Sequence, residues 1–157
     1  MLETFQTNDI FAIVVVVSSI ALLIYFAGKT LITSNFFQKG VNLYQQQDYQ
    51  GAEAAFRQVI SLNSTNDMVR LLLGDVLKEQ GKVEEAKEWF EDVIRRSPKN
   101  PQAYLRLANV LMQQEQPEAA KTNLQQAKEL LRKQRQPEKA EKITQLLDKM
   151  NAKSNQS

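Results

Sequence analysis

The sequence contains neither cysteine nor histidine among its 157 residues. The absence of cysteine excludes disulfides, thiol chemistry and cysteine-based metal sites. The absence of histidine removes the usual general base and the commonest metal ligand. The phosphate-binding patterns GxxxxGK[ST] and GxGxxG and the nucleophile pattern GxSxG do not occur either. We therefore predict that the chain is not an enzyme and binds no cofactor.

Glycine and proline are also scarce, with 5 and 4 residues, whereas Gln, Leu, Ala, Lys and Glu are abundant. Such a composition favours helix over sheet and predicts an all-α fold. The formal net charge is only +2, so the overall balance gives no indication of nucleic acid as a partner.

Charge is absent from residues 10–28, and twelve of these nineteen residues are Ile, Val, Leu or Phe. Nineteen helical residues span roughly 28 Å, close to the hydrocarbon thickness of a bilayer. The segment therefore predicts a transmembrane helix with the lipid bilayer as its partner. Residues 1–9 form a short tail before it, and residues 29–34 a linker after it.

Three alternatives to a permanent anchor fit less well. A cleaved signal peptide needs a basic start, but Glu3 and Asp9 precede the apolar run without any Lys or Arg. A lipoprotein anchor needs a cysteine. A buried soluble helix is rarely apolar all round for this length.

All 20 Lys and Arg residues follow the apolar run, beginning at Lys29. Positive charge collects on the cytoplasmic side of a membrane. We therefore predict a single-pass protein whose body lies on the cytoplasmic side, or on the stromal side of an equivalent organellar membrane.

The remainder of the chain repeats itself at a spacing of 34 residues. Each repeat has a small residue, a large apolar residue three positions later, a second small residue nine positions after that, and a large apolar residue four positions further on. The three sets are Gly40, Leu43, Ala52 and Phe56; Gly74, Leu77, Ala86 and Phe90; and Ala108, Leu111, Ala120 and Leu124. Small residues allow two antiparallel helices to approach closely, and the large ones fill the flanking space.

This pattern resembles the tetratricopeptide repeat family, with residues 67–100 as the best match. The resemblance implies an α-solenoid of three helical hairpins over 33–134, divided as 33–66, 67–100 and 101–134. Residues 135–150 carry one apolar stripe and predict a capping helix, and the polar residues 151–157 predict a disordered tail.

The resemblance also implies that the first helices of the hairpins line a concave groove for proteins. Carried over position by position, ten residues are predicted to face it: Phe37, Val41, Tyr44, Met68, Leu71, Asp75, Lys78, Leu105, Asn109 and Met112. Most of them are apolar, so we expect a patch suited to an amphipathic helix or an extended peptide.

Basic clusters occur at Arg95–Arg96 and along 128–135. Near helix C-termini such residues complement the helix dipole. Contact with anionic lipid or with acidic loops of a partner is the alternative.

We interpret the chain as a membrane-anchored scaffold or adaptor that binds protein clients, namely subunits of a membrane complex or their assembly factors. Its layout is similar to that of the anchored tetratricopeptide factors that assist photosystem assembly. Two alternatives stay open: a targeting or import receptor for amphipathic precursor segments, and a bacterial envelope protein with the repeats in the periplasm.

Overall fold

The computed structural model describes the backbone of residues 2–154 and the side chains of residues 9–152. The described part of the chain is helical throughout apart from short turns, which confirms the all-α prediction. The helices are α1 (Leu2–Gln45), α2 (Tyr49–Leu62), α3 (Asp67–Glu79), α4 (Val83–Arg96), α5 (Pro101–Gln113), α6 (Pro117–Lys133) and α7 (Pro137–Ser154).

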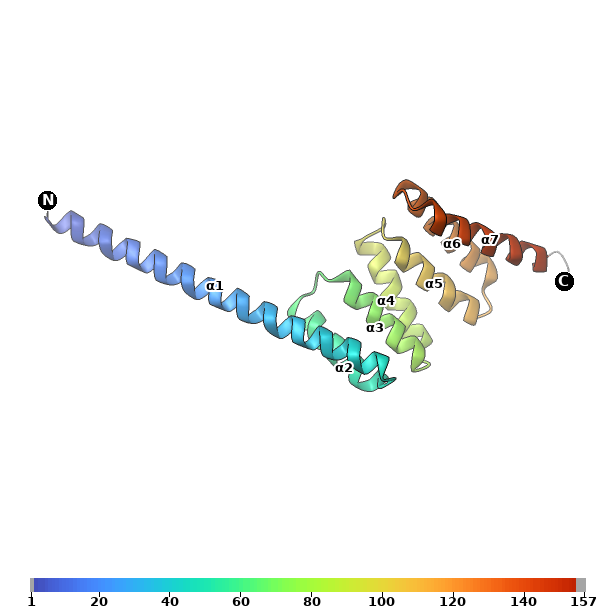
Figure 1. Cartoon of the computed structure of the whole chain (residues 1–157), viewed down its shortest axis with the longest axis horizontal. Helices are drawn as coiled ribbons and strands as arrows, with labels where there is room; N and C mark the ends of the chain where they lie inside the picture. The colour runs from blue at the N-terminus through green and yellow to red at the C-terminus, as the bar shows by residue number, and fades with distance from the viewer. Residues whose placement is uncertain (1, 155–157) are drawn as a thin grey trace.

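Three antiparallel hairpins stack into a solenoid (Figure 1). The C-terminal part of α1 pairs with α2, α3 pairs with α4, and α5 pairs with α6, while α7 packs on α6 as an end cap. A row of buried residues runs through the stack, including Phe56, Leu77 and Leu131.

The small residues of the repeat are where the paired helices approach most closely. A Cβ on Gly40 would lie 2.6 Å from Cε1 of Phe56, and a Cβ on Gly74 would lie 2.8 Å from Cζ of Phe90. Both rings are fully buried. The first hairpin therefore closes in the same way as the second, with the neighbouring Lys39 side chain directed to solvent.

The connections follow from local chemistry. The Asp48, Asn66 and Asn100 side chains accept hydrogen bonds from the backbone N–H groups of Gly51, Val69 and Gln102, which caps the N-termini of α2, α3 and α5. Turns within and after the hairpins place one residue in the left-handed region. These residues are Gln47, Gly81, Glu115 and Arg135.

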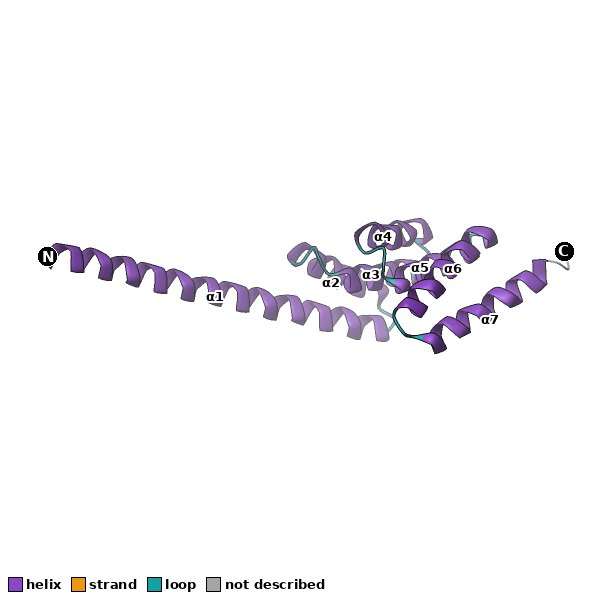
Figure 2. Cartoon of the chain, turned by 90° about the horizontal axis from the view of Figure 1, so that it is seen from above, coloured by secondary structure: helices purple, strands orange, loops and turns teal. Residues whose placement is uncertain are grey.

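The predicted division of the N-terminal region is wrong in two places. Helix α1 runs unbroken from Leu2 to Gln45, so residues 2–9 are helical and residues 29–34 are not a separate linker (Figure 2). No proline interrupts this stretch, and the hydroxyls of Thr30 and Thr33 donate to the carbonyls of Phe26 and Lys29, each at 2.8 Å, without opening the helix.

The apolar part of α1 is long enough to cross a membrane by length and composition, and none of it is buried against the rest of the described chain. Ser18 and Ser19 donate to the carbonyls of Val14 and Val15 at 2.7 Å, so their hydroxyls are satisfied within the helix. At the other end, α7 extends to Ser154, so residues 151–154 of the predicted tail are helical. Residues 155–157 lie outside the described residues.

Candidate functional site

The candidate site is a cavity of about 300 Å³ on the face formed by α1, α3 and α5. Five of the ten predicted groove residues line it together: Tyr44, Asp75, Lys78, Leu105 and Asn109. They come from the first helix of each hairpin, as the repeat predicts. Two further residues, Phe90 and Arg106, complete the lining.

The floor of this cavity depends on close packing of the second hairpin. Phe90 comes from α4 and is fully buried, yet it reaches the cavity because Gly74 has no side chain to cover it. The register of Phe90 in the repeat identified it as a core residue. Its second role as the floor was not predicted.

An ion pair crosses the cavity from α5 to α3. Nε of Arg106 donates to both carboxylate oxygens of Asp75, at 3.0 and 2.8 Å, and its Nη1 donates to Gln102 at 3.2 Å. Burial raises the pKa of Asp75, although the positive charge of Arg106 opposes this shift. The pair therefore fixes two neighbouring repeats relative to each other and places a desolvated carboxylate at the centre of the groove.

Arg106 was missed because it lies next to, and not at, the positions that the family resemblance assigns to the groove. The sequence does contain a signal for Arg106, because Asp75 is an acidic residue at a position predicted to face the groove. A buried carboxylate needs a cation from a facing helix.

Two more ionisable groups flank the pair. Burial raises the pKa of the Tyr44 phenol, and the negative charges of Asp75 and Glu79 raise it further. The carboxylate of Glu79 accepts a hydrogen bond from Lys78 and holds the pKa of that ammonium above its usual value. The groove centre thus combines a phenol, an ion pair, an ammonium and the exposed amide of Asn109.

The expected continuous apolar patch is not formed. Leu71 is only 2% exposed and belongs to the core, so its assignment to the groove is wrong. Met68 and Met112 are exposed, but they lie near opposite ends of their helices, outside the residues that line the cavity. Phe37 and Val41 are half-buried against the core.

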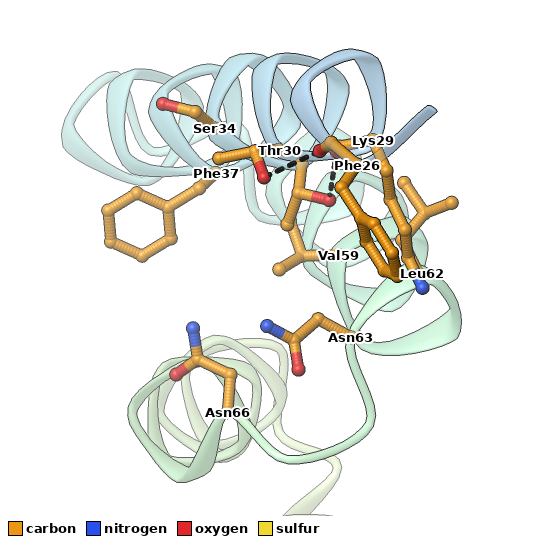
Figure 3. Close-up of a pocket in the computed structure, with 10 residues that line it drawn as sticks. Phe26, Lys29, Thr30, Ser34, Phe37, Val59, Leu62, Asn63 and Asn66 are labelled. Atoms are coloured by element: carbon orange, nitrogen blue, oxygen red, sulfur yellow. Dashed lines mark hydrogen bonds between the residues drawn. The ribbon is translucent and has the colours of Figure 1, made fainter. Parts of the chain in front are cut away.

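Phe37 instead lines a second cleft, of about 470 Å³, where α1 passes the C-terminal end of α2 (Figure 3). The amides of Asn63 and Asn66 lie across this cleft from the residues of α1. Of the described residues that line it, Lys29 alone is charged.

Comparison with known proteins identifies the repeats. A family model described as a tetratricopeptide repeat matches residues 37–101 and again residues 71–132, together more than half of the chain. A search of curated proteins found no match.

Several solved structures share the fold. The type III secretion translocator chaperone SycD of Yersinia enterocolitica superposes with a TM-score of 0.71 at 22% identity, covering 78% of this chain and 93% of SycD. The TPR2B domain of yeast Sti1, solved in a complex with pHsp70, has a TM-score of 0.71 at 18% identity, covering 78% of this chain and 98% of the domain. PcrH of Pseudomonas aeruginosa, solved with the chaperone binding region of PopD, has a TM-score of 0.70 at 20% identity, covering 77% of this chain and 92% of PcrH.

Proposed function

This chain belongs to the tetratricopeptide repeat family, and we propose that it is a membrane-anchored scaffold whose groove binds a segment of a client protein. The observation that carries this proposal is the cavity in which Tyr44, Asp75, Lys78, Leu105 and Asn109 converge from three helices. Several structural relatives were solved in complex with a segment of another protein, which supports a protein-binding role for this fold.

The chemistry of the groove favours a client segment with both polar and apolar side chains. Leu105 and the ring of Tyr44 offer apolar contact, and Asn109 and Lys78 offer hydrogen bonds to backbone carbonyls. The carboxylate of Asp75 is already engaged by Arg106. Asp75 therefore acts mainly by fixing the distance between α3 and α5, the helices that line the groove.

The apolar surface of α1 supports membrane anchoring. Fifteen large apolar side chains between Ile10 and Ile32 are exposed, and several of them, such as Phe11 and Leu23, are exposed by more than two thirds. An uninterrupted apolar helix with no protein partner is stable in hydrocarbon, where its backbone bonds are satisfied internally. With Lys29 following the apolar run, the body lies on the cytoplasmic or stromal side.

A tethered groove meets clients that are themselves membrane-bound at a raised effective concentration. This favours a role in assembling or stabilising a membrane protein complex, of which a photosystem is one case. A targeting receptor for precursor segments is the alternative that the same groove permits.

Photo-crosslinking in membranes of cells that make the full chain tests the proposal. The probe replaces Asn109, which is exposed and lines the groove, and a matched control probe replaces Gln126 on α6, which is exposed outside it. Adducts specific to Asn109 with subunits or assembly factors of one membrane complex support the scaffold. Adducts only with soluble precursors indicate the targeting receptor. The absence of adducts specific to Asn109 would contradict client binding in the groove.

A further inference from the structure

The charges of the helical body are divided between its two edges. The edge toward the N-terminal end of α1 holds the loops between hairpins, at 62–67, 95–101 and 132–138 (Figure 1). We call this the basic edge, because it carries six Lys or Arg residues and two carboxylates. The opposite edge holds the turns within hairpins, at 45–49, 79–85 and 113–118, and carries six carboxylates and one Lys.

Complementing the helix dipole explains only part of this division. Arg95, Arg96, Arg132 and Lys133 lie in the last turns of α4 and α6, where cations are favoured. Lys99 and Arg135 lie beyond the helix ends, so the dipole does not account for them. Lys99, Lys133 and Arg135 are also exposed and form no ion pair within the described residues, so their charge is available to a partner.

Continuity of α1 brings this edge to the boundary of the proposed membrane span. Leu31 and Ile32 are 72% and 51% exposed, so the apolar surface of the helix continues past Lys29 up to the body. Residues 10–32 span roughly 34 Å, slightly more than the hydrocarbon thickness, which a tilt of about 20° accommodates. With no flexible spacer, the tilt of α1 sets how closely the basic edge approaches the headgroup layer.

The cleft beside Lys29 lies at the same level as the end of the apolar run. Its lining combines the ammonium of Lys29 with hydroxyl and amide groups, including Ser34, Asn63 and Asn66, and no described carboxylate lines it (Figure 3). Phe26 and Leu62 add apolar surface. A cation with neutral hydrogen-bond donors next to apolar side chains suits the phosphate of a phospholipid and the upper part of its acyl chains.

We propose that the basic edge, together with the cleft beside Lys29, docks on the headgroups of anionic phospholipids. This inference rests on the proposed membrane anchoring of α1. Docking adds a second contact between the body and the bilayer, which tilts the solenoid toward the membrane surface and sets the direction in which the groove opens.

Fluorescence quenching by a nitroxide on lipid headgroups tests the docking, with the full chain reconstituted in phosphatidylcholine vesicles with or without phosphatidylglycerol. Because the chain has no cysteine, Gln134→Cys gives a single labelling site on the α6–α7 loop of the basic edge, and Gln46→Cys gives one on the opposite edge. Both residues are exposed. We expect strong quenching at position 134 with phosphatidylglycerol, relieved by salt, and little quenching at position 46.

Charge variants identify the residues responsible. Replacing Lys99, Lys133 and Arg135 by Gln is expected to lower the ratio of docked to free body roughly 100-fold, at about a factor of five per cation near an anionic surface. The control replaces Lys39, Lys142 and Lys149 by Gln, an equal loss of charge away from the basic edge, and should leave the ratio unchanged.

Three results would overturn the docking. They are equal quenching at positions 134 and 46, quenching at position 134 that is the same with and without phosphatidylglycerol, and equal effects of the two triple variants. Quenching that requires an added acidic client protein would assign the basic edge to a protein partner and also overturn it. Extraction of the vesicles with alkaline carbonate separates the two proposals. If the chain resists extraction but shows no docking, the anchoring proposal stands and only the docking inference is wrong. If the chain is extracted, both proposals are wrong.

Discussion

The close approach of α3 and α4 at Gly74 makes a quantitative prediction. Replacing Gly74 by Ala removes a flexible residue from a helix interior, which alone would stabilise the protein by about 1 kcal/mol. The new methyl group, however, would lie 2.8 Å from Cζ and 3.0 Å from Cδ1 of Phe90. Phe90 is fully buried and borders the groove cavity, so its ring can relieve this contact only by shifting toward that cavity and giving up its packing between α3 and α4.

Overpacking of this kind costs about 1–3 kcal/mol. We therefore expect a net loss of about 1 kcal/mol in the free energy of unfolding, which lowers the melting temperature of a domain of about 100 residues by roughly 4–8 °C. Trp89 on α4 is the only tryptophan, so its fluorescence during heating of the full chain in detergent reports on the body and not on the apolar helix.

The third repeat supplies the control. It has Ala108 and Leu124 where the first two repeats have Gly and Phe, so a larger residue on one helix accompanies a smaller one on the other. The double variant Gly74→Ala/Phe90→Leu should therefore be more stable than the sum of its single changes predicts. A Gly74→Ala variant that melts at or above the parent temperature, or a double variant with strictly additive effects, would refute the close approach.

Three further predictions can be read with the same tryptophan signal. Leu71→Ala should destabilise the body by about 2–5 kcal/mol because its side chain lies in the core. Asn109→Ala should leave stability unchanged and reduce client crosslinking from a probe placed at Lys78 instead of position 109. The reverse pattern would show that Leu71 faces the groove. Arg106→Gln should cost about 1–3 kcal/mol because it leaves the desolvated carboxylate of Asp75 without its charged partner, and Asp75→Asn in the same chain should recover part of the loss. Burial raises the pKa of Glu53, but hydrogen bonds from Lys82, Gln80 and Arg57 outweigh burial and lower this pKa to about 2. The contribution of Glu53 to the free energy of unfolding is therefore complete above its ordinary pKa of 4.5 and is lost as the pH falls toward 2. Glu53→Gln should remove this part of the acid sensitivity of the melting temperature.

The repeat architecture was predictable because its cause is local and periodic. Gly40, Gly74 and Ala108 recur at a fixed spacing, and each must face a large residue on the paired helix. The family model extends over all three hairpins, which confirms this part of the interpretation.

The groove was predictable only in part because it depends on the twist between hairpins. Tyr44 and Asn109 line the groove, as their positions within the repeat predict, but the Leu71 side chain points into the core. Arg106 enters the cavity through its pairing with Asp75, and a contact between residues of different repeats has no counterpart in the pattern within one repeat.

The continuity of α1 was not predictable from composition. Residues 29–34 change from apolar to polar, which suggested a linker, yet a change in polarity does not end a helix. Ending a helix takes a proline, a glycine in the left-handed region or a competing cap, and this segment contains none of them.

An unbroken helix holds the body at a fixed distance from the apolar run, whereas a flexible tether would allow a range of distances. A flexible chain allows its end to sample every height up to its full length, with a spread that grows as the square root of residue number. In α1, Tyr44 follows Ile32, where the exposed apolar run ends, by twelve residues of continuous helix, which places the groove about 18 Å from the end of that run along the helix axis. In the proposed membrane setting, a client is then selected by how far its binding segment projects from the bilayer as well as by its sequence. Inserting or deleting one helical turn before Phe36 would change which segments are within reach.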